Sequence, residues 1–203
     1  MATIIKSSPE KPRSNGVYRS KELMLVDFDE TIMFDNSALS SAGVEVTGKL
    51  LRRSEIKGLE DETRRGIYLL AADKYAYVMR PNHKIIELMG SEIAKKDVII
   101  LTARLDDIAD GTLKLLRTYL VPFDELILRE SDLAKMRDEV WKTNQVYELL
   151  KTYSKIDLYE DKLDNISYIC RVLMDNRINY FGVSPNEISL YSRYDLGGWS
   201  LWQ

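Results

Sequence analysis

The sequence predicts an α/β fold with a doubly wound, mostly parallel, Rossmann-like sheet and a small helical insertion after the first strand. From residue 82 onward, strand-like apolar runs alternate with segments of helical periodicity, which is typical of parallel sheets covered by helices on both faces. Residues 32–81 show no strand alternation and are too many for a simple connection, so they predict the insertion. With 203 residues, of which 45% are hydrophobic, the chain can form one domain of this kind.

The elements can be placed from their patterns. The first strand is expected at residues 23–26, where four apolar residues in a row precede two aspartates. Further strands are expected at residues 97–101, 125–128, 155–159 and 178–183. Helices are expected at residues 82–96, 106–120, 132–153 (in two pieces) and 166–174, because apolar residues recur there at helical spacing.

The chain ends and the net charge indicate where the protein is expected to act and which partners it can attract. Residues 1–20 are rich in Ser, Pro, Lys and Arg and predict a flexible N-terminal arm, which leaves residues 21–203 as a single domain. No segment has the pattern of a membrane span or a signal peptide, so a cytoplasmic protein without a membrane partner is expected. The net charge of −3 gives no general attraction to a polyanion, although a local basic patch would suffice for nucleic acid. Nothing in the sequence indicates the oligomeric state.

Two acids directly follow the first strand. Asp27 and Asp29 occupy alternate positions, so both side chains point to the same face at the edge where open α/β sheets bind ligands. Carboxylates this close repel each other, and a bound divalent cation is the usual remedy. An ionised aspartate could attack phosphorus while its partner passes a proton. On this stretch alone, a solvated acidic turn explains the pattern equally well.

Other polar residues follow later strands or begin a helix, and a parallel sheet would bring them to the same edge. They are Thr102, Arg104, Lys142, Glu160, Asp161 and Asp164. Thr102, with the backbone N–H beside it, and Lys142 could hold phosphate oxygens, and the acids could complete an oxygen shell around Mg²⁺. Each residue alone has a plainer explanation as a helix cap, a surface lysine or a solvated turn. Their combination favours phosphoryl transfer.

This order of motifs resembles the haloacid dehalogenase superfamily. The matching segments are Asp-Phe-Asp-Glu-Thr at 27–31, Leu-Thr-Ala-Arg at 101–104, the lysine at 142 and Tyr-Glu-Asp-Lys-Leu-Asp at 159–164. The resemblance implies an Mg²⁺-dependent phosphatase that hydrolyses phosphomonoesters through an aspartyl-phosphate. A narrower similarity, to Swiss Army Knife RNA repair-like phosphatase domains and polynucleotide kinase–phosphatases, implies nucleic-acid ends or nucleotides among the phosphorylated substrates, beside small molecules.

The resemblance also implies a role for each matching residue. Asp27 would be the nucleophile and Asp29 the general acid/base, with the backbone carbonyl of Asp29 on the metal. Asp161 would be the acidic metal ligand beside Asp27 and Asp29, with support from Glu160 or Asp164. The substrate phosphate would be bound by Thr102, Ala103, Arg104 and Lys142.

Several alternatives stay open. The chain could be a catalytically idle binding or scaffold protein that docks partners through the insertion or the aromatic C-terminus. A metal-independent sugar or carbonyl enzyme has less support: paired carboxylates can serve glycoside hydrolysis, but they would not call for Thr102 and Lys142. Basic residues of the insertion could form a rim for polynucleotide or an ordinary solvated face; they are Arg52, Arg53, Lys57, Arg64 and Arg65. Cys170 is expected in the core, and His83 at the surface.

Overall fold

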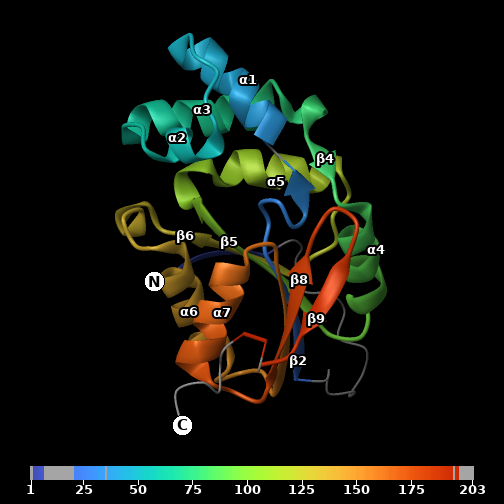
Figure 1. Cartoon of the computed structure of the whole chain (residues 1–203). Coiled ribbons are helices and arrows are strands. Elements are labelled where there is room, and N and C mark those ends of the chain that lie inside the picture. The colour runs from blue at the N-terminus through green and yellow to red at the C-terminus, as the bar shows by residue number, and fades with distance from the viewer. Residues whose placement is uncertain (1, 7–20, 35, 194, 197–203) are drawn as a thin grey trace.

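The computed structural model describes residues 2–6, 21–34, 36–193 and 195–196 (Figure 1). A seven-stranded sheet has the order β1-β6-β5-β2-β7-β8-β9. β2, β5, β6, β7 and β8 are parallel, whereas β1 and β9 pair antiparallel at the two edges. The strands are β1 (Ala2–Lys6), β2 (Glu22–Val26), β5 (Asp97–Leu105), β6 (Glu125–Arg129), β7 (Lys155–Glu160), β8 (Ile178–Val183) and β9 (Ile188–Tyr191).

Helices cover both faces of the sheet. Alternate residues of β2 point to opposite faces, so Met24 joins the core under α4 and α5, and Leu25 joins the core under α6 and α7. These helices are α4 (His83–Glu92), α5 (Ala109–Thr118), α6 (Asp138–Leu149) and α7 (Leu163–Leu173), and short 3₁₀ turns lie at η2 (Asp106–Ile108) and η3 (Ser131–Leu133). The predicted doubly wound, mostly parallel α/β fold is confirmed.

The segment after β2 forms a compact helical unit beside α5 (Figure 1). The chain passes into and out of it through a short antiparallel pair, β3 (Met33–Phe34) and β4 (Arg80–Pro81). Between them lie α1 (Asn36–Thr47), α2 (Arg53–Lys57), α3 (Asp61–Asp73) and η1 (Ala76–Val78). Buried residues of α3, among them Ile67 and Ala72, belong to the same hydrophobic cluster as Met24, so the unit shares the core of the sheet.

Close packing fixes α3 against α5. A Cβ atom at Gly111 of α5 would lie only 2.8 Å from the Cβ atom of Ala72, so glycine is required at this crossing. Tyr119 also donates a hydrogen bond across the boundary to the carbonyl oxygen of Ala76, at 3.1 Å. Part of the insertion is therefore anchored to the sheet domain.

The expected flexible arm needs correction over its first residues. Ala2–Lys6 forms β1 and pairs with β6, with Ile4 opposite Ile127. The open edge of β6 supplies the backbone partners, and Ile5 packs against the core. These are tertiary contacts, which the mostly polar composition of residues 1–20 does not indicate. Residues 7–20 lie outside the described part. Within the described ranges, none of the helices has the length and apolar character needed to cross a bilayer.

Candidate active site

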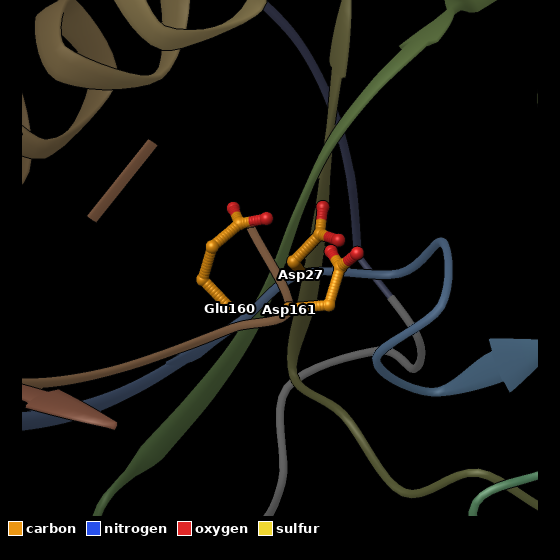
Figure 2. Close-up of side chains that lie close together, drawn as sticks. All are labelled: Asp27, Glu160 and Asp161. Atoms are coloured by element: carbon orange, nitrogen blue, oxygen red, sulfur yellow. The ribbon is translucent and has the colours of Figure 1, made fainter. Parts of the chain in front are cut away.

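The candidate site lies at the carboxyl ends of β2 and β7. These strands are parallel neighbours, with Val26 opposite Tyr159, so the residues that follow them emerge side by side. Asp27 follows β2, Glu160 ends β7 and Asp161 comes next. Figure 2 shows the three carboxylates converging, and one oxygen from each lies within 4.8 Å of the others.

One oxygen of this cluster has no partner of its own. Oδ1 of Asp161 is buried and accepts no hydrogen bond from the described residues. A buried acceptor is costly when it is left unsatisfied, and a cation bound to oxygen ligands would satisfy it.

Lys142 reaches the cluster from α6 on the other side. It is 3% exposed, and its Nζ donates to Oδ1 of Asp27 and to Oε2 of Glu160, at 2.5 Å in each case. Three carboxylates and one ammonium leave two negative charges without a partner inside the cluster. A divalent cation carries the matching charge, so the chemistry of the donor set fits a hard divalent cation such as Mg²⁺.

The pKa values of the cluster are shifted by burial first and by neighbouring charges second. Burial and the negative charge of Glu160 raise the pKa of Asp27 to about 6, although Lys142 acts in the opposite direction. Burial also raises the pKa values of Glu160 and Asp161. For Lys142, burial lowers the pKa, but the two carboxylates raise it by more, so the ammonium stays charged. A further positive charge beside these acids would therefore stabilise their ionised forms.

The side chain of Asp29 has different partners. Arg104 donates from Nε and Nη2 to Oδ1 of Asp29, at 2.9 and 2.7 Å. Arg53, the first residue of α2, places Nη2 3.2 Å from the same oxygen. The Asp29 carboxylate is not part of the three-acid cluster.

The remaining predicted site residues differ in whether they line the cavity or join the acids. Thr102 is fully buried, and its Oγ1 accepts a hydrogen bond from the backbone N–H of Arg104 rather than lining the cavity. Ala103 and Arg104 do line the cavity. Asp164 is exposed in the first turn of α7, and the structure does not bring it together with the other acids.

A cavity of about 250 Å³ opens beside the cluster, between the sheet domain and the insertion. The insertion lines it with Arg53, Arg64, Arg65 and Tyr68, whereas Arg52 does not take part. The sequence left these arginines open as a basic rim or a solvated face, and it gave no sign that Tyr68 would line the cavity, because Tyr68 lies within an apolar run.

Two other expectations concern residues away from this cavity. Cys170 lies on the buried face of α7, in the core as predicted, and His83 is exposed in the first turn of α4. In the aromatic C-terminal segment, residues 194 and 197–203 lie outside the described part, and they include Tyr194, Trp199 and Trp202.

No family model and no curated protein matches the sequence. Solved structures do match. A predicted phosphatase from Clostridium acetobutylicum superposes with a TM-score of 0.58 at 14% identity, covering 81% of this chain and 85% of that chain. A HAD-superfamily hydrolase of subfamily IA, variant 1, from Geobacter sulfurreducens gives 0.53 at 11% identity, covering 86% and 92%.

A chain of the Pnkp1/Rnl/Hen1 complex gives a TM-score of 0.49 at 14% identity, covering 89% of this chain and 50% of that chain, which is too weak to bear on the substrate. At such low identities, structural similarity is informative about the fold alone. The chain has the fold of the haloacid dehalogenase superfamily, in agreement with the resemblance of its motifs.

Proposed function

We propose that this protein is an Mg²⁺-dependent phosphohydrolase that cleaves phosphomonoesters through an aspartyl-phosphate at Asp27. The observation that carries the proposal is the buried contact of Asp27 with Lys142 inside a cluster of acids whose charge is not balanced. A nucleophile held by a lysine at a strand end, next to an oxygen-rich cation site, is suited to phosphoryl transfer.

Asp27 and Asp161 would hold the metal, with Glu160 in support and the backbone carbonyl of Asp29 as a further ligand. When bound, Mg²⁺ would supply the positive charge that offsets the carboxylates and the phosphate oxygens. Lys142 adds a fixed positive charge beside Asp27 and holds Oδ1 of its carboxylate in place.

The proposed reaction has two displacement steps, with Asp27 as the nucleophile and Asp29 as the proton carrier. In the first, a carboxylate oxygen of Asp27 forms a bond to phosphorus while the bond from phosphorus to the leaving oxygen breaks, and Asp29 gives that oxygen a proton. In the second, Asp29 takes a proton from a water molecule that attacks phosphorus, the bond to Asp27 breaks, and inorganic phosphate leaves. The same group thus serves as acid and then as base.

Substrates would be phosphorylated small molecules, nucleotides or nucleic-acid ends. Arginines of the insertion line the cavity and support an anionic substrate. Turnover of a 3′-phosphorylated oligonucleotide and of a free nucleotide, each measured over a range of salt concentrations, separates these classes. Strong salt sensitivity for the oligonucleotide alone would identify a polynucleotide substrate.

The test of the proposal is hydrolysis of an aryl phosphate with and without Mg²⁺. We expect turnover that depends on Mg²⁺ and is lost in Asp27→Asn. The matched control is Asp110→Asn, which removes an exposed carboxylate of α5 and should keep full activity. A parent protein that is inert toward every phosphomonoester, or an active Asp27→Asn variant, would overturn the proposal.

A further inference from the structure

The insertion contacts Asp29, which lies just after β2 and would transfer the proton. Arg53 of α2 lies 3.2 Å from Oδ1 of Asp29 and 3.5 Å from Oε1 of Glu30. Glu30 has a positive φ of 62°, which is unfavourable for a residue other than glycine. A single guanidinium from the insertion therefore spans Asp29 and the strained residue that follows it.

The insertion also contacts Asp29 indirectly, through Arg104. The guanidinium carbon of Arg104 lies 5.7 Å from the ring centroid of Tyr68 in α3 and 4.5 Å from that of Phe28. Both distances fall within the range of cation–π attraction. The Arg104 side chain is only 3% exposed, and two of its nitrogens already donate to Asp29. This geometry suits a residue that orients Asp29 better than one that grips substrate.

Resting on the proposed function, we infer that the insertion orients the general acid/base: Arg53 directly, and Tyr68 by holding Arg104 against Asp29. Arg53 and Tyr68 are then positioning residues, and the insertion completes the catalytic arrangement as well as lining the cavity. Two contacts from Arg104 and one from Arg53 reach Oδ1 and hold this oxygen in place, which limits rotation of the carboxyl group. Proton transfer depends steeply on such alignment.

Leaving groups of different basicity distinguish this role from substrate binding. An alkyl phosphate needs a proton on its leaving oxygen, whereas an acidic aryl phosphate hardly needs one. For Arg53→Gln and Tyr68→Ala, we expect kcat/KM for the alkyl phosphate to fall about tenfold and that for the aryl phosphate less than about threefold, a fraction of what a general acid contributes. Tyr68→Phe keeps the ring, so its ratio of kcat/KM for the alkyl phosphate to kcat/KM for the aryl phosphate should equal that of the parent.

Matched controls come from the same insertion. Arg52→Gln changes the neighbouring arginine outside the cavity, and Tyr77→Ala removes a tyrosine that is 76% exposed; neither should move the ratio. An equal fall for both substrates, a rise in KM alone, or no change in Arg53→Gln and Tyr68→Ala would overturn the inference. If the parent hydrolyses aryl phosphates, any of these outcomes leaves the proposed function standing.

A measurement without turnover tests the contact itself. The Nε–H signal of Arg104, assigned in a ¹⁵N spectrum by its loss in Arg104→Lys, should exchange slowly with solvent in the parent. We expect it to shift and exchange at least about tenfold faster in Tyr68→Ala, but not in Tyr68→Phe or Tyr77→Ala. An unchanged Arg104 signal in Tyr68→Ala would overturn the coupling, whether or not the parent proves to be a phosphatase.

Discussion

The ammonium of Lys142 lies 2.5 Å from a carboxylate oxygen of Asp27, although the two residues are 115 positions apart in the sequence. Both are almost fully buried, one at the end of a central strand and the other on a helix that covers the sheet. A buried charge is costly unless it is paired, so the carboxylates around Lys142 depend on its ammonium.

Removing the ammonium should destabilise the protein strongly. Lys142→Met leaves Asp27 and Glu160 buried without a cation, and breaking such a pair from one side typically costs about 3–5 kcal/mol. Urea unfolding at pH 8 without divalent cations measures this loss, which should shrink at pH 5 as the acids take up protons. Lys151→Met removes a lysine from an exposed pair with Glu148 and should leave the free energy of unfolding unchanged. A Lys142→Met variant as stable as its parent at pH 8 would contradict the account.

Asp27→Asn should stabilise the metal-free protein while it abolishes turnover. Folded Asp27 keeps its proton up to a pKa of about 6, whereas the unfolded chain releases it near 3.8. Between these values the folded state binds more protons, so the contribution of Asp27 to stability falls as pH rises. The advantage of Asp27→Asn over the parent should therefore grow across this window to about 3 kcal/mol, since one pKa unit is worth about 1.4 kcal/mol.

Unfolding of both proteins from pH 3.5 to 8, with a chelator present, measures that difference. Acids outside the cluster titrate alike in the two proteins, whereas the charge of Asp27 raises the pKa of Asp161, so the difference reports Asp27 together with the acids it faces. A difference that stays flat, or that favours the parent as pH rises, would show that Asp27 is not destabilised by its surroundings. Added Mg²⁺ should reduce the difference above pH 6.

Asp161 should control metal binding, and Asp164 should not. At a free concentration of about 100 times its dissociation constant, a ligand that binds only the folded state stabilises it by about 2.7 kcal/mol. We expect Mg²⁺ to raise the Tm of the parent and of Asp164→Asn, but not that of Asp161→Asn. Equal responses of the two variants would mean that the cluster of Asp27, Glu160 and Asp161 is not the metal site.

Glycine at the contact between α3 and α5 should matter far more than glycine on the surface of α3. Gly111→Ala places a Cβ atom 2.8 Å from that of Ala72 and should destabilise the protein by about 1–3 kcal/mol through overpacking. Gly66→Ala meets no atom within 4 Å and should stabilise α3 by up to about 1 kcal/mol. Thermal unfolding compares the two, and a Gly111→Ala variant that gains stability would disprove the close packing of the insertion.

The charged cluster was predictable because strand ends are visible in sequence. Asp27, Glu160 and Asp161 each follow an apolar run, and parallel pairing brings such ends together. The contact between Arg53 and Asp29 was not predictable, because Arg53 reaches it through the tertiary packing of a segment that has no strand pattern. The strand at Ala2–Lys6 was missed for a similar reason, since its pairing depends on the free edge of β6.

The central claim is that Asp27 carries the phosphoryl group, and trapping that group tests it most directly. Protein mixed with an aryl phosphate and Mg²⁺ is quenched in acid, treated with borohydride to reduce an acyl phosphate to the alcohol, digested and analysed by mass spectrometry. We predict homoserine at position 27, more abundant in Asp29→Asn, whose intermediate should break down slowly, and absent without substrate. Turnover with aspartate unchanged at position 27 under all of these conditions would contradict the account.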